Sequence, residues 1–305
     1  MTTREGSLDA PTRHPVEWRD PAFYDENALH EEMERVFDIC HGCRRCVSLC
    51  RAFPVLFDLV DESTTMEVDG VAKADYVKVV DQCYLCDVCY MTKCPYVPPH
   101  PWNVDFPHLM LRAKAVKFRK GETSLRDRLL TSTDRVGRLA TIPVVVRAVN
   151  KANATPFARK AMDAVLGVAA EAALPPYASP TFRASAAPSI AWPVRDGRRT
   201  PGKVAVFSTC YVNYNEPGIG RDLLQVLAHN EIPYALLQKE ACCGMPKLEL
   251  GDLASVEQLK NVNIPALADH ARKGFAIMTA VPSCTLMYKQ ELPLLFPDDP
   301  DVREV

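Results

Sequence analysis

The sequence lacks the features that would place it across a membrane or in an oxidising compartment. No run approaches the roughly 18 apolar residues of a membrane-spanning helix, and the best candidate, residues 142–146, is followed directly by Arg147. The first 20 residues carry scattered charges and no apolar core of a signal peptide. Cysteine accounts for 12 of 305 residues, well below the roughly 8–10% of a disulfide scaffold. We therefore expect a cytoplasmic protein with reduced thiols.

A strong net charge is missing too. Lysine and arginine number 36 against 38 acidic residues, a formal net charge of −2. No overall field favours nucleic acid, so no nucleic-acid partner is expected. The apolar share of 48% suffices for a sizeable core, and the length predicts about two domains by the usual prior of roughly 150 residues per domain.

The cysteines that are present are unevenly spread. Eight lie between Cys40 and Cys94, none lies from residue 95 to 209, and four follow from Cys210 onward. In a reducing compartment, dense thiols indicate metal binding or catalysis before they indicate disulfides.

The first eight cysteines form two similar runs. The spacing C-x2-C-x2-C-x3-C occurs once, and its repeat has one extra residue before the last cysteine and Pro95 after it. In two-cluster ferredoxins the fourth cysteine of each run serves the other cluster. The sequence therefore predicts one [4Fe–4S] cluster on Cys40, Cys43, Cys46 and Cys94, and a second on Cys83, Cys86, Cys89 and Cys50.

A pair of zinc sites with four thiolates each is the alternative for these eight residues. Zinc sites usually come as separated C-x2-C pairs, so three evenly spaced cysteines favour iron–sulfur clusters. His41 and His100 could replace ligands, but eight cysteines already match eight positions, and we interpret both histidines as neighbours.

The surroundings of these runs favour helices over the short hairpins of small bacterial ferredoxins. Leu29, Met33, Val36 and Phe37 share one face before the first run, and a second helical pattern follows the other run at residues 107–118. Residues 51–82 form a long connection between the runs. We expect an α-helical ferredoxin domain over residues 28–111, preceded by an N-terminal arm, residues 1–27.

Residues 112–201 are expected to be a basic helical segment and a Pro-rich linker. From Arg112 to Lys160 there are 13 basic and three acidic residues, with apolar residues at helical spacing and a bend or break at Pro143. This stretch could dock an acidic partner or an anionic membrane surface, could be a solvated helix face, or could pair with the acidic stretch Asp20–Asp38. Six prolines in residues 174–201 predict the linker.

After residue 202 the pattern alternates between strand and helix. Residues 203–207, 234–238 and 275–281 read as strands, and residues 218–230 and 252–274 as helices, which predicts βαβ units and a parallel sheet. The glycines at 218 and 220 lack the third glycine of a dinucleotide fingerprint and indicate a helix start.

The last four cysteines follow the carboxyl ends of these strands. Such ends lie along one edge of a parallel sheet, so Cys210, Cys242, Cys243 and Cys284 are expected to meet and bind metal. Gly244 suits a backbone that approaches a bulky cofactor. Two alternatives are buried cysteines acting as small hydrophobes and a redox disulfide between Cys242 and Cys243.

At this point the sequence resembles a known family. A double ferredoxin run followed by CCG and a further cysteine is similar to the cysteine-rich (CCG) iron–sulfur electron-transfer proteins, which include the iron–sulfur subunit of glycolate oxidase and the D subunit of heterodisulfide reductase. The segments FSTCYVNYNEPGIGRDLLQVL and KEACCGMP are most like the C-subunit type of anaerobic glycerol-3-phosphate dehydrogenase. The resemblance implies a fold class of α plus α/β, with a CCG domain over residues 202–305 and a third iron–sulfur cluster there.

The resemblance also implies the function. We expect an iron–sulfur subunit that carries electrons from a flavin-containing dehydrogenase, or another redox subunit, toward a quinone or other acceptor. It would sit in the cytoplasm, with a peripheral contact on the inner face of the cell membrane as an option. One alternative is a heterodisulfide-reductase-like enzyme that reduces a disulfide at the CCG-domain cluster, and another is a non-redox zinc or regulatory protein. No catalytic residue is assigned, and whether the chain is itself an enzyme stays open.

Two departures from the family pattern concern the C-terminal site. Met287 stands where the family has a further cysteine, and a thioether is a much weaker ligand. Family members of this type also tend to carry a second CCG domain. We expect either a truncated chain or a partner that supplies the rest.

Overall fold

The computed structural model describes residues 11–92, 94–194 and 202–305. Residues 1–10 of the expected arm and residues 195–201 of the expected linker lie outside this range. The chain divides into two compact units, each described by itself. Unit 1 comprises residues 1–123 and 248–253, and unit 2 comprises residues 124–247 and 254–305. Within the described residues no helix is long and apolar enough to cross a membrane.

Unit 1 is helical. Its elements are η2 (Pro21–Tyr24), α1 (Glu26–Cys43), α2 (Ala52–Asp61), η3 (Val68–Gly70), η4 (Lys73–Asp75), α3 (Tyr76–Val80), α4 (Val88–Thr92) and α5 (Phe106–Arg119).

The core of unit 1 forms around α1. Asp25 caps this helix by accepting a hydrogen bond from the Ala28 N–H at 2.8 Å. The face expected to be apolar, Leu29, Met33, Val36 and Phe37, is the buried face. Aromatic rings from α2, α3 and α5 pack around it, with 5.1 Å between the ring centroids of Phe37 and Tyr76 and 4.7 Å between those of Phe53 and Phe106.

Part of the expected pairing between the basic and acidic stretches lies inside unit 1. Lys120 Nζ lies 3.0 Å from Glu26 Oε2, and the Arg112 guanidinium donates to backbone carbonyls of residues 22, 23 and 25. The start of the basic stretch therefore holds the segment before α1.

Unit 2 combines helices with one small sheet. Its helices are α6 (Leu125–Leu130), α7 (Thr133–Ala140), α8 (Pro143–Ala154), α9 (Pro156–Leu166), α10 (Phe182–Ser185), α11 (Cys210–Tyr214), α12 (Pro217–His229), α13 (Met245–Leu250), α14 (Leu253–Arg272), α15 (Pro282–Leu286), the π-helical turn η5 (Met287–Glu291), α16 (Leu292–Leu295) and α17 (Pro300–Glu304). Its strands are β1 (Ser189–Ile190), β2 (Val204–Phe207), β3 (Tyr234–Leu236) and β4 (Ala276–Thr279). Residues 248–253, which include the end of α13, belong to unit 1.

The sheet is mixed, which corrects the expectation of a parallel sheet. Its strand order is β1-β3-β2-β4. β2 runs parallel to both β3 and β4, as the βαβ pattern predicts, but β1 pairs with β3 antiparallel. β1 lies inside the segment expected to be a Pro-rich linker. Its two residues pair through backbone groups at the edge of the sheet, where flanking prolines remove no ladder hydrogen bond.

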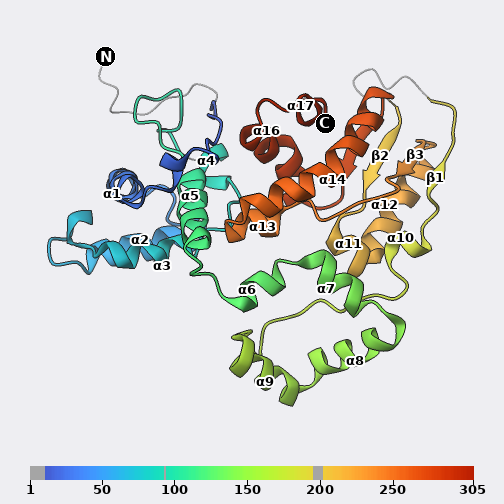
Figure 1. The fold of residues 1–305 in the computed structure, drawn as a ribbon, viewed down its shortest axis with the longest axis horizontal. Helices are drawn as coiled ribbons and strands as arrows, with labels where there is room; N and C mark the ends of the chain where they lie inside the picture. Colours follow the sequence, from blue (N-terminus) through green and yellow to red (C-terminus); the bar gives the residue numbers. More distant parts are fainter. Residues whose placement is uncertain (1–10, 93, 195–201) are drawn as a thin grey trace. The chain divides into compact units, whose positions relative to one another are not determined.

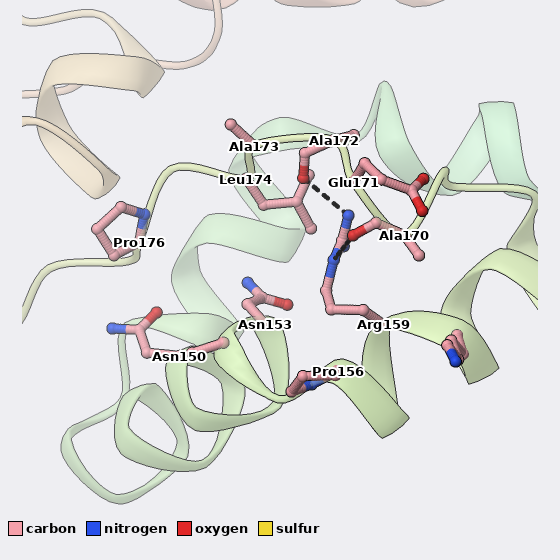
Figure 2. A pocket seen from close by; sticks show the side chains of 12 residues that line it. Asn150, Asn153, Pro156, Arg159, Ala170, Glu171, Ala172, Ala173, Leu174 and Pro176 are labelled. Carbon is pink, nitrogen blue, oxygen red and sulfur yellow. Dashed lines mark hydrogen bonds between the residues drawn. The ribbon is translucent and has the colours of Figure 1, made fainter.

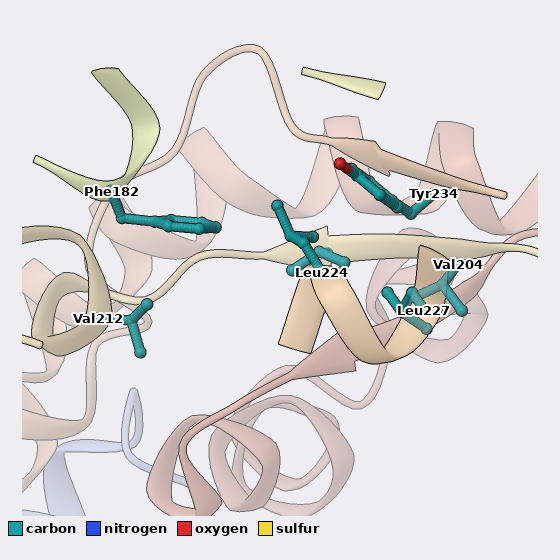
Figure 3. Packing of buried hydrophobic residues seen from close by; sticks show 7 residues of the cluster. Phe182, Val204, Val212, Leu224, Leu227 and Tyr234 are labelled. Carbon is teal, nitrogen blue, oxygen red and sulfur yellow. The ribbon is translucent and has the colours of Figure 1, made fainter. Parts of the chain in front are cut away.

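A hydrophobic cluster joins the strands to α12 (Figure 3). Its buried members are Phe182, Val204, Val206, Val212, Leu224, Leu227 and Tyr234. Gly220 on α12 faces the Phe182 ring, where an added Cβ would lie 2.5 Å from a ring carbon. This close approach explains why glycine stands inside that helix.

The remainder of the basic stretch folds as four short helices, not as one long amphipathic helix. Figure 1 shows α6, α7, α8 and α9 following one another as separate segments. Pro143 is the first residue of α8 and Pro156 the first of α9, since the fixed φ of proline suits the first helical turn but not a helix interior. The break at Pro143 agrees with the sequence, and the other breaks were not predicted.

Candidate metal centres

The first cysteine group lines one pocket in unit 1. Cys40 and Cys43 lie in the last turn of α1, which ends where Arg44 adopts a left-handed conformation with a φ of 52°. The pocket is lined by Cys40, Cys43, Cys46 and Cys94 together with Ile39, Arg45, Phe53, Pro95, Tyr96 and Val104. Cys94 thus joins the three cysteines of the first run, and not its own run, at this pocket.

The pKa shifts of these cysteines indicate the same grouping. Burial, and then the neighbouring thiols Cys94, Cys46 and Cys43, raise the pKa of Cys40 well above its ordinary value. Burial followed by Cys94 raises the pKa of Cys46 to about 11. The four thiols raise one another's pKa values because deprotonating one places negative charge beside the others, and Arg45 only partly opposes this effect at Cys46. A bound cation would relieve the repulsion between the thiolates.

The second group gathers around the loop before α4. Burial raises the pKa of Cys83 to about 11, and the nearby thiols Cys50 and Cys86 add to this effect. The Leu85 N–H and Lys114 act in the opposite direction. Leu85 and Asp87 both have positive φ, 51° and 60°, so the loop is tightly wound between its cysteines. Cys50 also raises the pKa of Cys46, so it lies near both runs.

Cys89 faces both groups. After burial, the thiols that raise its pKa are Cys83 from the second group and Cys46 and Cys40 from the first. The two groups of unit 1 are therefore neighbours.

An arginine that the sequence did not single out anchors this loop. Arg13 is buried between two carboxylates, pairing with Asp87 in the loop and, through Nε at 2.9 Å, with Asp105. Its guanidinium also lies 4.5 Å from the centroid of the Tyr90 ring on α4. Residues 11–13 thus hold the segment between Cys86 and Cys89. An isolated arginine in a charged N-terminal stretch gave no signal of this role.

His41 and His100 are occupied by other partners. His41 Nε2 lies 3.4 Å from Asp61 Oδ1, and His100 Nδ1 accepts the Trp102 N–H at 3.1 Å.

The third group forms at the carboxyl ends of β2, β3 and β4 in unit 2. Cys210 begins α11 directly after β2, and its Sγ lies 4.0 Å from that of Cys242. Cys243 interacts with both Cys242 and Cys284, which sits in α15 after β4. Except for Cys210, these cysteines are buried. The structure brings together the four cysteines that the sequence places at the strand ends.

Cys242 accepts hydrogen bonds from the other thiols of this group. Hydrogen bonds from Cys210 and Cys243 outweigh burial and lower the pKa of Cys242, with further help from the Gly244 N–H. The same interactions raise the pKa values of Cys210 and Cys243. Thiolate is the form that binds metal, so the group is set to lose its first proton at Cys242.

Two side chains from distant parts of unit 2 hold the backbone of the Cys242 loop. Asp134 on α7 accepts the Cys242 N–H at 2.5 Å. Asn263 on α14, with 0% exposure, accepts the Ala241 N–H at 2.8 Å and donates to the carbonyls of Ala241 and Cys242 at 3.1 and 3.0 Å. Because these polar groups of the buried turn have partners, the cysteine pair has a defined position.

A buried carboxylate supports the neighbouring loop. Glu240 accepts the Ser208 N–H at 3.0 Å, just before Cys210, and forms an ion pair with Arg183 at 3.2 Å. Burial raises the pKa of Glu240 to about 7, against the opposing effects of Arg183 and Ser208. This carboxylate links the ends of β2 and β3.

Met287, which the resemblance predicts to stand in place of a further cysteine, is fully buried next to Gly244. Gly244 has a φ of 103°, and a Cβ there would lie 3.3 Å from the Met287 methyl group. The thioether side chain therefore packs directly on the turn that follows Cys243, and glycine is needed there both for its conformation and for this contact.

The donor chemistry of these sites favours soft metals. Each group offers four thiols, the ligands of iron–sulfur clusters and of thiolate zinc sites. In residues 11–92, 94–194 and 202–305, no three His, Cys, Asp or Glu side chains are arranged to hold a single metal ion. Within the third site, the buried hydroxyl of Tyr288 has no hydrogen-bond partner among the described residues. The donor set and this unpartnered hydroxyl both fit a cluster with sulfur atoms of its own.

A pocket elsewhere in unit 2 serves the fold. Figure 2 shows it over α8 and α9, with Arg159 pointing toward residues 170–172. Arg159 donates to the carbonyls of Ala169, Ala170 and Ala172 at 2.6 to 3.2 Å. These bonds tie the segment after α9 to that helix, and none of the twelve cysteines lines the pocket.

Comparison with known proteins defines the class of the C-terminal part. Residues 204–289 match the cysteine-rich domain family, CCG. This range contains all four cysteines of the third group, so the chain carries a CCG cysteine-rich domain at its C-terminal side, as the sequence predicts.

The curated relatives include a subunit of a dehydrogenase and a subunit of a reductase. The chain is 31% identical over 199 residues to the C subunit of anaerobic glycerol-3-phosphate dehydrogenase from Escherichia coli (strain K12), a match that covers 63% of this chain and 47% of the relative. It is 29% identical over 97 residues to the B subunit of fumarate reductase (CoM/CoB) from Methanothermobacter marburgensis, covering 32% of this chain and 19% of the relative. Lactate utilization protein A of Bacillus cytotoxicus is 30% identical over 98 residues, covering 32% of this chain and 39% of the relative.

These matches confirm the predicted resemblance to the CCG family and to the C-subunit type of glycerol-3-phosphate dehydrogenase. The chain spans about half the length of that relative. No solved structure is significantly similar to it.

Proposed function

We propose that this chain is an electron-transfer subunit with two [4Fe–4S] clusters in unit 1 and a third iron–sulfur cluster in its CCG domain. When bound, such clusters accept and pass on single electrons. The observation that supports the proposal most is that Cys94 lines the pocket of the first run, as an exchange of fourth ligands between the two runs would require. Zinc sites built from one run each would not need that exchange.

The protein's own residues would hold and insulate these centres. Cys40, Cys43, Cys46 and Cys94 would bind one cluster, Cys83, Cys86, Cys89 and Cys50 another, and Cys210, Cys242, Cys243 and Cys284 the third. Phe53 and Val104 exclude water from the first site, and the Leu85 N–H donates toward Cys83 in the second. Such apolar walls and N–H···S contacts set the reduction potential of a cluster.

The partner is a flavin-containing dehydrogenase or another redox subunit, and the acceptor a quinone or other oxidant. The relatives' names support this, because one relative is a subunit of an anaerobic glycerol-3-phosphate dehydrogenase and another is a subunit of a fumarate reductase. Both names describe parts of larger redox enzymes.

Single cysteine replacements test the cluster assignment. In Cys43→Ser we expect the electron paramagnetic resonance signal of one reduced [4Fe–4S] cluster to disappear while the other persists, and in Cys86→Ser the reverse. Cys94→Ser should resemble Cys43→Ser, although Cys94 belongs to the other run. Loss of the second-run signal in Cys94→Ser would contradict the exchange of ligands.

A peripheral membrane contact is proposed for α6 to α9, and would place the chain at the cytoplasmic face of the membrane. Large apolar side chains stand exposed on these helices, with Leu125 at 84% and Phe157 at 83% exposure. Lysine and arginine outnumber acidic residues along the same segment. Exposed apolar groups amid basic ones are typical of helices that lie on an anionic lipid surface.

Vesicle binding tests this contact. Vesicles with phosphatidylglycerol should bind the protein more strongly than phosphatidylcholine vesicles, rising salt should weaken the binding, and Phe157→Ser should reduce it. Val226→Ser on α12, which removes another exposed apolar group, is the control. Binding that ignores both salt and Phe157→Ser would exclude a membrane role for these helices.

A second candidate function is reduction of a disulfide at the CCG domain. A pocket of about 220 Å³ opens beside Cys210 and is lined by Asp134, Arg183, Tyr214 and Glu240, among others. There a disulfide would take two electrons and two protons and leave as two thiols, with the electrons delivered by a reduced donor such as dithionite. Turnover of a small disulfide by the purified chain would support this function, and activity unchanged in Cys243→Ala would contradict it.

A further inference from the structure

The phenol of Tyr288 is buried in the third cysteine group without a hydrogen bond. The side chain is only 6% exposed. In the part of the chain that the structure describes, its hydroxyl has no hydrogen-bond partner, and the neighbouring cysteine sulfurs do not serve as one. A buried hydroxyl normally has a partner because burial removes its bonds to water.

The position of this hydroxyl is set by the helical turn that carries Tyr288 and by the packing of its ring. Tyr288 follows Cys284 by one helical turn, where α15 runs into the π-helical turn η5, a kind of irregularity that often marks functional sites. Its ring packs edge-on against Phe207 at the end of β2, with 5.1 Å between centroids and an angle of 76° between the rings. The ring cannot turn its hydroxyl toward solvent without losing these contacts.

The groups around the phenol are those of the third site. Besides burial, the groups that raise the pKa of Tyr288 are Cys243, Cys284, Glu240 and Cys242. Three of these four are cysteines proposed as ligands. The buried hydroxyl therefore lies near the thiols of the third group.

We propose that Tyr288 donates a hydrogen bond to the iron–sulfur cluster bound by Cys210, Cys242, Cys243 and Cys284, and thereby raises its reduction potential. The inference rests on the proposed third cluster. Reduction adds negative charge to the cluster and its sulfur atoms, so an O–H donor stabilises the reduced form more than the oxidised form. Tyr288 is then a positioning and tuning residue, not a ligand.

The test compares Tyr288→Phe with Tyr234→Phe in the full chain. Both replacements remove only a hydroxyl from a buried ring of unit 2, but Tyr234 belongs to the hydrophobic cluster around β2 and its pKa is raised by burial alone. The third cluster is identified as the signal that Cys243→Ser removes. Its midpoint potential is then measured by redox titration followed by electron paramagnetic resonance.

We expect Tyr288→Phe to lower the potential of the third cluster only, and Tyr234→Phe to leave all potentials unchanged. Tyr288→Phe should also speed the loss of the third cluster to a chelator. The metal-free protein gives an independent readout: Tyr288→Phe should unfold at a urea concentration at least as high as wild type, because the removed hydroxyl had no partner there.

An unchanged potential and chelator rate in Tyr288→Phe, with the third cluster present, would overturn the inference and leave the proposed function standing. A clear loss of stability in metal-free Tyr288→Phe would overturn it too, since the hydroxyl would then have a protein partner. If the wild-type protein assembled only the two clusters of unit 1, both the role of Tyr288 and the proposed third cluster would be contradicted.

Discussion

Arg13 and its two carboxylates form a buried charge cluster beside the second cysteine run. Side-chain exposure is 5% for Arg13 and 2% for Asp87, so neither charge is solvated by bulk water. Breaking a buried ion pair by removing one partner leaves an uncompensated charge. We expect Arg13→Ala to lower the free energy of unfolding of unit 1 by about 3–5 kcal/mol. Urea titrations measure this change. Arg19→Ala, which removes an exposed arginine, is the control and should have a far smaller effect. Equal effects of the two replacements would show that the buried ion pair does not stabilise unit 1.

The same cluster predicts a dependence of stability on pH. Burial alone would raise the pKa of Asp105, but hydrogen bonds from His108 and Arg13 outweigh it and hold that pKa well below its ordinary value. A carboxyl whose pKa is lower in the folded state stabilises the fold above its unfolded pKa of about 3.9, and this contribution is lost as the pH falls through lower values. Wild type should therefore lose more stability between about pH 5 and pH 3 than Arg13→Ala. Parallel pH profiles would show that Arg13 does not lower this pKa.

Asn263 predicts a separate effect on the third centre. Replacing it with leucine leaves the Ala241 N–H and two carbonyls of the Cys242 turn without partners, at a cost of about 1–3 kcal/mol. We expect Asn263→Leu to reduce the yield of the third cluster while the two signals of unit 1 persist. Asn261→Leu, an exposed position on the same helix, should leave all three signals intact. A normal third signal in Asn263→Leu would show that the turn does not need this clamp.

At the residue scale the sequence predicts the candidate ligands better than the residues that support them. Spacing groups the first eight cysteines, and the ends of the predicted strands group the last four. Asp134, Asn263 and Arg13 act from positions far away in the sequence, and ordinary polar residues carry no spacing pattern. Only Tyr288 left a usable signal, since it lies one helical turn after Cys284.

Helix α12 offers a comparison at the scale of a single element. A Cβ added to Gly220 would lie 2.5 Å from a carbon of the Phe182 ring. A Cβ added to Gly218 would have only Arg221 Nη2 nearby, at 3.9 Å. Alanine favours a helix interior over glycine by up to about 1 kcal/mol, but overpacking costs about 1–3 kcal/mol. We expect Gly220→Ala to destabilise unit 2 in urea titrations and Gly218→Ala to be neutral or stabilising. If Gly220→Ala stabilised unit 2, the Phe182 ring would be able to move aside without a loss of free energy of unfolding, which would contradict this expectation.

Elements with strong local signals are the ones that the sequence predicts well. β2, β3, β4 and α12 lie within one or two residues of their expected bounds, because apolar runs and helix starts are local features. β1 was missed because its two residues become a strand only through pairing with β3, which no local pattern records. The basic stretch has more breaks than the one expected at Pro143, because its apolar spacing continues across the break at Ser132 and so gives no sign of it.

At the scale of the whole molecule, the twelve cysteines divide into three groups of four. Two groups lie in the helical unit 1 and are neighbours through Cys89. The third lies at the strand ends of unit 2, inside the CCG domain.

The most direct measurement of the central claim is an analysis of iron, zinc and acid-labile sulfide in the full chain purified without oxygen, combined with electron paramagnetic resonance of the reduced protein. We expect iron with matching sulfide and no stoichiometric zinc. Two [4Fe–4S] signals should be removed separately by Cys43→Ser and Cys86→Ser, and a third signal by Cys243→Ser. Stoichiometric zinc without sulfide, and no resonance signal on reduction, would contradict it.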